Sequence, residues 1–134
     1  MENELKLKDV IHRLQTTPGF DVYAINHLIE DTGANTVLRI LARFSVSLEE
    51  SLPGFDKGGT ESQTSVWKSA HKLAGSAEML GFKDFGQKSK HLSSVLKNSD
   101  NPNTHVGEIS AYKNEVTDLI GTISKSFPER QNFL

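Results

Sequence analysis

The stretch that decides the fold is Ser65–Phe82, with the sequence S-V-W-K-S-A-H-K-L-A-G-S-A-E-M-L-G-F. At about 100° per residue its apolar positions fall within a sector of roughly 80°, which predicts the buried stripe of an amphipathic helix. These positions are Val66, Ala70, Leu73, Ala77 and Leu80. His71 lies about 140° from Val66 on the same projection. We therefore expect a helix that packs through one face and exposes His71 on another.

The residues one turn from His71 make this surface a candidate functional site. A glycine inside a helix costs about 1 kcal/mol relative to alanine, and Gly75 stands four residues after His71. Its missing side chain would let another molecule approach the imidazole. The alternative interpretation is an ordinary exposed histidine beside a glycine that serves helix packing.

The same periodicity continues on both sides of this stretch. Apolar residues at helical spacing predict six helices, over residues 4–14, 21–31, 35–52, 65–80, 83–98 and 106–127. Asp21 is expected to cap the second helix, and Gly81 to end the fourth in a tight turn. We expect a loop over 53–64, with Thr64 or Ser65 as the next cap, and a turn over 98–103. No segment alternates with period two, so we expect no sheet.

These elements predict an all-α fold. Helices that are each apolar on one face and joined by short connections favour an antiparallel four-helix bundle, here built from the last four helices. One or two short accessory helices would precede it. Residues 1–20 would form an N-terminal helix or linker, 21–128 the bundle, and 129–134 a C-terminal tail.

Composition excludes several classes of function. The net charge of −2 and the sequence pI of about 6.2 argue against a nucleic-acid surface. Without cysteine the chain has neither disulfides nor thiolate metal sites. We find no apolar run long enough for a membrane span and no signal-peptide core near the N-terminus, so we expect a cytoplasmic domain without membrane contact.

The order of residues around His71 carries more information than the periodicity. The motif H-x-L-x-G-S-A-x-x-L-G-F closely resembles the signature of histidine-containing phosphotransfer (HPt) domains, the phosphohistidine carriers of two-component phosphorelays. It comprises His71, Leu73, Gly75, Ser76, Ala77, Leu80, Gly81 and Phe82. The resemblance extends over about residues 21–127, since HPt domains share a four-helix core with a shorter accessory helix.

The resemblance implies a chemistry for His71. A neutral imidazole can attack phosphorus through a ring nitrogen and form a phosphoramidate. By this resemblance, Nε2 of His71 accepts the phosphoryl group from a receiver-domain aspartyl phosphate and passes it to a response-regulator receiver. The receiver supplies the aspartate and Mg²⁺, so the chain needs no cofactor of its own.

Residues on the helix after Gly81 could support the phosphoryl group. Gly86, Lys90, Ser93 and Lys97 form one flank of that helix, which would face His71 if the helix returns antiparallel. Ser93 falls where many HPt domains place a glutamine or glutamate that hydrogen-bonds the ring, and Lys97 matches a position that is basic in some members. The alternative for Lys90 and Lys97 is an ordinary solvated helix face.

The chain departs from the family pattern before the glycine. Many members carry a lysine three residues after the histidine, where this chain has Ala74. Lys72 projects about 100° from His71, whereas Lys68 lies one turn before it. We expect Lys68 to replace part of the missing charge.

Partner docking and metal binding concern further residues. Trp67 could anchor a docking surface together with Gly75 and Glu78, although a core tryptophan and a plain surface acid are the alternatives. The other histidines show no spacing of a bundle metal site, so we expect no metal there. They are His12, His27, His91 and His105.

Three functions compete at this point. The leading one is a monomeric phosphohistidine carrier without an ATP site, either free-standing or a domain of a hybrid sensor histidine kinase. The second is an HPt-like module that docks a receiver or kinase without phosphotransfer. The third, a bundle enzyme or metal carrier, is disfavoured because carboxylate–histidine pairs are missing.

Overall fold

The computed structural model describes residues 2–56, 59–100 and 105–134, with side-chain surroundings omitted for 59–62. Their secondary structure is helical, with one isolated bridge between Phe20 and Phe82 in place of any strand. The all-α class is confirmed. The helices are α1 (Glu2–Leu14), α2 (Val22–Thr32), α3 (Ala34–Ser51), α4 (Gly59–Leu80), α5 (Lys83–Lys97) and α6 (Val106–Ser126), with 3₁₀ turns η1 (Leu52–Asp56) and η2 (Arg130–Phe133).

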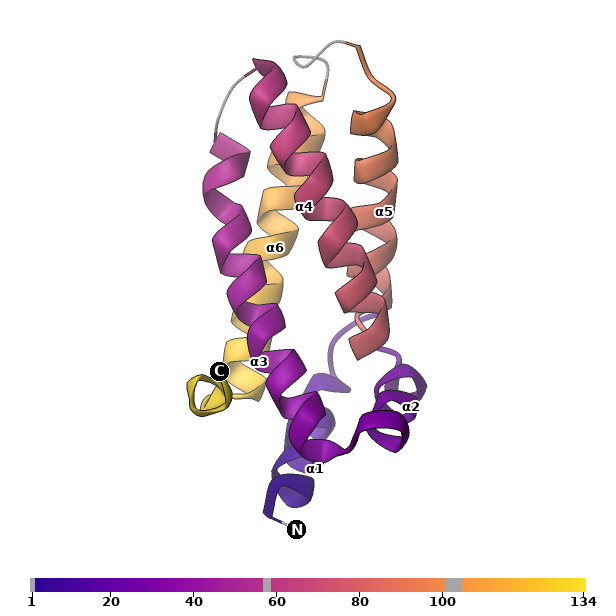
Figure 1. The fold of residues 1–134 in the computed structure, drawn as a ribbon, viewed down its shortest axis with the longest axis vertical. Coiled ribbons are helices and arrows are strands. Elements are labelled where there is room, and N and C mark those ends of the chain that lie inside the picture. The colour runs from indigo at the N-terminus through magenta and orange to yellow at the C-terminus, as the bar shows by residue number, and fades with distance from the viewer. Residues whose placement is uncertain (1, 57–58, 101–104) are drawn as a thin grey trace.

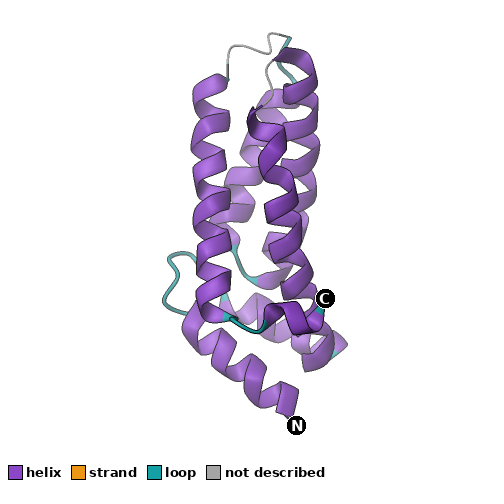
Figure 2. Ribbon diagram, turned by 90° about the vertical axis from the view of Figure 1, so that its left-hand side faces the viewer, coloured by secondary structure: helices purple, strands orange, loops and turns teal. Residues whose placement is uncertain are grey.

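The four longest helices lie along the long axis of the molecule. Helices α3, α4, α5 and α6 run beside one another, and α1 and α2 lie across one end of them (Figures 1 and 2). Among the described elements, α4 and α5 are the most extensively packed pair. None of the described helices combines the length and hydropathy that crossing a bilayer requires.

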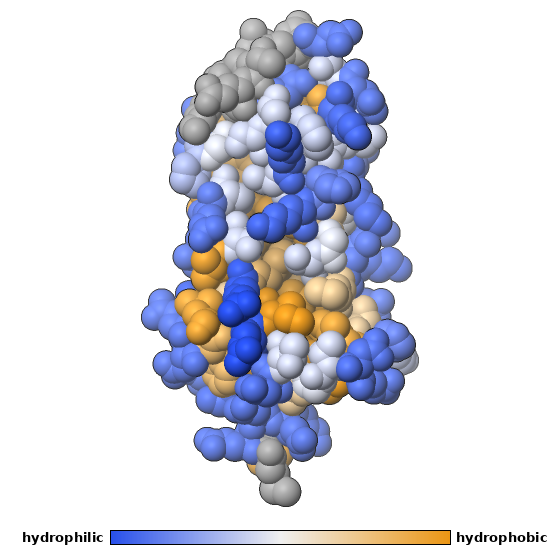
Figure 3. Space-filling view, in the orientation of Figure 1, coloured by the Kyte–Doolittle hydropathy of each residue, from blue (hydrophilic) through white to orange (hydrophobic). Residues whose placement is uncertain are grey.

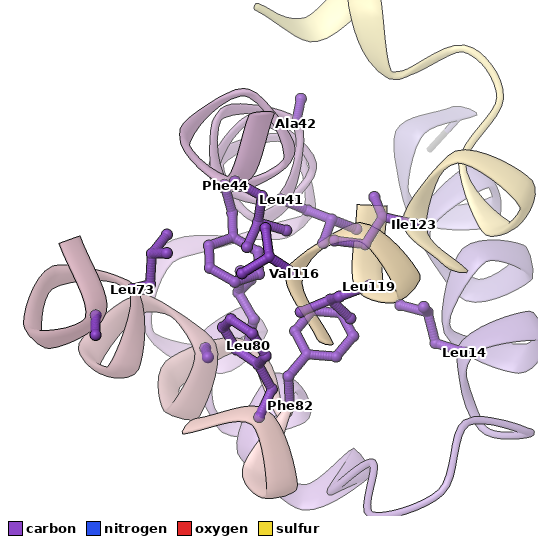
Figure 4. Packing of buried hydrophobic residues seen from close by; sticks show 14 of the residues in the cluster. Leu14, Leu41, Ala42, Phe44, Leu73, Leu80, Phe82, Val116, Leu119 and Ile123 are labelled. Carbon is purple, nitrogen blue, oxygen red and sulfur yellow. The ribbon is translucent and has the colours of Figure 1, made fainter. Parts of the chain in front are cut away.

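One hydrophobic core joins these helices. The five apolar residues that define the stripe of α4 are all buried, each at most 2% exposed. They meet inward-facing side chains of α3 and α6, and Figure 4 shows Leu73 and Leu80 directed toward Phe44 and Val116. Burial of such side chains is the main stabilising contribution to a domain of this size.

The N-terminal and C-terminal segments contribute to the same core. Leu7, Val10 and Leu14 of α1 are buried in the cluster that also contains the α4 residues. At the other end of the chain, the ring of Phe133 in η2 packs on Phe127 with centroids 5.4 Å apart. Both segments therefore cover the end of the long helices.

The connection before α4 differs from the sequence expectation. Helix α3 ends at Ser51 and continues as η1, and α4 already begins at Gly59, so the expected loop is wrong for 53–56 and 59–64. Residues 57–58 lie outside the described part. Thr64 and Ser65 are inside α4 and cap nothing. The reason is tertiary: Gln63 is buried against α5, so packing extends the helix beyond its apolar pattern.

The other boundaries follow the sequence closely. Asp21 caps α2, because its side chain accepts a hydrogen bond from the backbone N–H of Tyr23. A turn occupies 98–100, whereas 101–103 lie outside the described residues. Val106 keeps the helical spacing of the apolar residues of α6 but is 62% exposed, because it starts the helix beyond the packed region.

The α4–α5 turn is fixed by a glycine and by the chain before α2. Gly81 has φ +99°, and a Cβ there would lie 2.5 Å from the carbonyl oxygen of Asp21. The N–H of Asp21 donates to the carbonyl of Gly81 at 2.7 Å. A positive φ and this close approach both require glycine. The turn thereby holds α5 beside α4.

Candidate functional site

The site is centred on His71, in the middle of α4. His71 is exposed, as the helical projection predicts, while Ala70 and Leu73 beside it are buried. Among the described residues, none forms a side-chain hydrogen bond or ion pair with the imidazole. Both ring nitrogens are therefore available to a molecule from outside.

Gly75 leaves open space one turn beyond His71. A Cβ built on Gly75 would meet no atom of a neighbouring element within 4 Å, so no contact with the residues that the structure describes explains this glycine. Gly121 in α6 is equally open, so openness alone does not identify a site. The significant feature is that the open position adjoins an exposed histidine.

Ser93 contacts the backbone of α4 rather than an exposed group. It is buried, and its hydroxyl donates to the carbonyl oxygen of Trp67 at 3.1 Å. That carbonyl is the helical acceptor for the N–H of His71. Ser93 therefore fixes α5 against the turn of α4 that carries the histidine.

Two lysines lie at the indole of Trp67. The ammonium of Lys97, at the end of α5, is 5.7 Å from the ring centroid, and that of Lys68 is 6.0 Å away. Both distances are within the range of cation–π attraction. Trp67 itself is half-buried and packs against the core. One part of its ring is therefore a core contact, and the other part is exposed surface.

Lys90 is held by an acid of α4. Its ammonium lies 2.6 Å from a carboxylate oxygen of Glu78. Glu78 also leans over Gly86, where a Cβ would approach its Cγ to 2.8 Å and the carbonyl of Ala74 to 3.5 Å. Ala74 is buried at this close approach of α4 and α5, where there is room only for a small side chain.

Lys72 lies on a different side of the site. It is exposed and lines a shallow pocket of about 190 Å³ together with Ser47 and Glu50 of α3. The structure thus places Trp67, Lys68, Lys90, Ser93 and Lys97 along the α4–α5 interface, and Lys72 along the α3–α4 interface.

The surface around these helices has two parts. Figure 3 shows mostly polar side chains over the upper half of the face and an apolar area lower down, around α3 and the second half of α4. Met79 of α4 is 43% exposed, and Ile40 of α3 is only partly buried. An accessible histidine thus shares α4 with exposed apolar surface.

The remaining histidines have separate environments. His27 lies 3.6 Å from Asp31, and Nδ1 of His105 lies 3.0 Å from Glu108, while His12 and His91 are exposed. Within the described residues, no group of three or more histidines and acids could hold a metal ion.

Sequence reasoning missed two contacts that shape the site. One is the ion pair of Glu78 with Lys90 beside Gly86. A glycine inside the predicted helix over 83–98 was the one sequence feature that could have indicated a close contact there. The other is Gln63, whose amide donates to the carbonyls of Leu96 and Ser99 at 2.8 and 3.0 Å and so holds the end of α5. No sequence pattern predicts the contacts of Gln63.

Comparisons with known proteins add no relative. No protein-family model matches this chain, and no curated protein or solved structure matches it significantly.

Proposed function

We propose that the chain is a phosphorelay carrier that accepts a phosphoryl group on His71 from a receiver-domain aspartyl phosphate and passes it to a response-regulator receiver. The observation that carries this proposal is an exposed, unpartnered imidazole on a rigid helix, with open space at Gly75 one turn beyond it. Such a group can enter the active site of another protein.

The fold and the motif support the same proposal. We interpret α3, α4, α5 and α6 as the antiparallel four-helix bundle of an HPt domain, with α2 as the accessory helix. The resemblance of H-x-L-x-G-S-A-x-x-L-G-F to the HPt signature then assigns the phosphorylated position to His71. The proposal applies equally to a free-standing cytoplasmic monomer and to a domain of a hybrid histidine kinase.

The transfer step needs few groups from this chain. The lone pair of Nε2 attacks phosphorus, a N–P bond forms, and the O–P bond of the acyl phosphate breaks with its electron pair left on the aspartate. Nδ1 keeps its hydrogen during this step. Phosphoryl transfer depends mainly on in-line positioning and charge neutralisation, which the partner's Mg²⁺ and nearby lysines would provide.

The partner would dock around α4. Trp67 and Met79 supply apolar surface on either side of His71, and Lys68 and Lys72 supply positive charge. Apolar anchors with a charged margin are typical of protein interfaces.

The test is phosphotransfer from a radiolabelled, phosphorylated receiver domain to purified protein. We expect acid-labile, alkali-stable label on the wild type and none on His71→Gln. His91→Gln is the matched control, because His91 is also exposed but lies on α5 at the groove with α6. Label that persists in His71→Gln would assign the chemistry to another residue. Absence of label with several receivers, together with measurable binding to one, would favour the docking module.

A further inference from the structure

We propose that Trp67 is a positioning residue for phosphotransfer: its indole holds the ammonium groups of Lys68 and Lys97 beside the phosphoryl group on His71. This inference rests on the proposed carrier function. It adds that cation–π contacts with the indole keep two lysine ammonium groups at the site without neutralising their charge.

The first step is the direction of the side chains. In an α-helix, side chains lean toward the N-terminus and cover the turn before their own Cα. On this geometry we expect the ring of His71 over the turn that contains Trp67 and Lys68. A phosphoryl group on the imidazole would share this surface with the two ammonium groups at the indole.

The second step is the rigidity of the indole and of the end of α5. Trp67 packs partly into the core, and its carbonyl is bound by Ser93, four residues before Lys97. The Gln63 amide donates to the carbonyls of Leu96 and Ser99, which lie on either side of Lys97. Helix α5 is thus tied to α4 on both sides of the point from which Lys97 reaches the indole.

The third step is charge. Lys90 and Lys113 each pair with a carboxylate at 2.6 Å, through Glu78 and Asp56. Among the side chains that the structure describes, no carboxylate pairs with Lys68 or Lys97. An aromatic face attracts a cation and leaves its net charge intact, whereas a carboxylate cancels it. Lysines held by Trp67 therefore remain available to an anion.

The experiment combines phosphotransfer with a double-mutant cycle. We expect Trp67→Leu and Lys97→Gln each to slow phosphoryl acceptance by about 2- to 5-fold, the size of an exposed cation–π contact. The double variant should be no slower than the slower single variant, because Trp67→Leu already breaks the contact that Lys97→Gln removes. Trp67→Phe, which keeps an aromatic face, should restore most of the rate. The effect of Lys97→Gln should shrink at high salt, and Trp67→Leu should reduce the salt dependence of the rate.

A second measurement tests the contact without phosphotransfer. Trp67 is the only tryptophan of the chain, so its fluorescence reports this position alone. Lys97→Gln should shift the emission, whereas Lys113→Gln, at a lysine paired with Asp56, should not.

The outcomes separate this inference from the proposed function. A wild type that accepts no label overturns the carrier function, whatever the fluorescence shows. A labelled wild type whose rate is unchanged in Trp67→Leu, or effects that multiply in the double variant, overturns the positioning role alone. An unchanged emission in Lys97→Gln overturns the contact itself.

Discussion

Helix α5 packs against α4 on one side and α6 on the other, and the two interfaces are built differently. The α4–α5 interface is close and lined by small or polar residues, with Gly86 against Ala74 and side-chain hydrogen bonds from Gln63 and Ser93. The α5–α6 interface is built of rings, with Phe85 stacked on Tyr112 at 5.5 Å. It also leaves an open groove of about 660 Å³ along its outer edge.

This difference indicates that the two interfaces of α5 serve folding stability and phosphotransfer to different degrees. Close packing through small residues leaves the long side chains of Trp67, Lys90 and Lys97 at the margin of the interface, beside His71. Packing through rings buries large apolar areas and contributes most to folding. Changes in the α5–α6 interface should therefore lower stability, and changes at the margin of the α4–α5 interface should lower transfer.

The largest expected effect is that of Phe85→Ala. Phe85 is 6% exposed and contacts the rings of both Tyr112 and Phe44. Removal of a buried phenyl group destabilises a domain by about 3–5 kcal/mol. Urea unfolding followed by circular dichroism measures the loss, with Lys83→Ala, at an exposed position of α5, as the control. A loss below about 1 kcal/mol would contradict the role assigned to this interface.

Gly86→Leu tests the closeness of the other interface. A Cβ at Gly86 already approaches Cγ of Glu78 to 2.8 Å and the carbonyl oxygen of Ala74 to 3.5 Å, so a leucine must displace the Glu78 side chain and crowd the backbone of α4. We expect a loss of about 1–3 kcal/mol in unfolding free energy. Gly75→Ala is the contrasting glycine change on α4: its Cβ enters open space, so stability should rise by up to about 1 kcal/mol. Equal losses of unfolding free energy in both variants would contradict the assignment of Gly86 to a close helix contact and of Gly75 to open space.

Much of the fold could be predicted from the sequence because burial follows helical periodicity. The stripe of α4, the exposure of His71, the cap at Asp21 and the turn at Gly81 all depend on local spacing or local backbone geometry. The early start of α4 could not be predicted, because it depends on contacts of Gln63 with residues far along the chain.

The same distinction holds for the candidate site. Spacing places Lys90, Ser93 and Lys97 on the flank of α5 that meets α4. It does not say that Ser93 binds a backbone carbonyl, that Lys90 pairs with Glu78, or that Lys97 lies at Trp67. These contacts depend on how closely the helices approach one another, to within a few ångströms. The spacing of residues along the sequence carries no such information.

Tyr112→Phe probes the polar contact inside the ring-built interface. Ser89 donates to the carbonyl of Phe85, so the Tyr112 hydroxyl, 2.7 Å from the Ser89 oxygen, is the donor between them. Loss of this bond should cost about 1 kcal/mol at neutral pH. The measurement is urea unfolding of both proteins at pH 7.

The same variant should also change how the free energy of unfolding depends on pH in the alkaline range. Burial raises the pKa of Tyr112 well above its ordinary value of about 10, because desolvation disfavours the charged phenolate. Because the unfolded chain releases the phenol proton first, wild-type stability is intact below about pH 10 and falls as the pH rises further. Tyr112→Phe should flatten part of this fall, whereas Tyr23→Phe, at a tyrosine that is 82% exposed, should not. Identical alkaline slopes in all three proteins would contradict the buried phenol.

The smallest expected effect on stability is that of Lys90→Gln, and it sharpens the contrast between the two kinds of lysine beside His71. The pair of Lys90 and Glu78 is largely solvent-exposed, so its loss should cost about 0.5 kcal/mol or less in urea unfolding. Its effect on transfer should also be small, since Glu78 already neutralises the charge. Glu78→Gln instead frees Lys90, adds net positive charge near the histidine, and should speed phosphoryl acceptance at low salt. If Lys90→Gln slows transfer more than Lys97→Gln does, then the carboxylate-paired lysine serves the phosphoryl group, and the indole-held lysine does not.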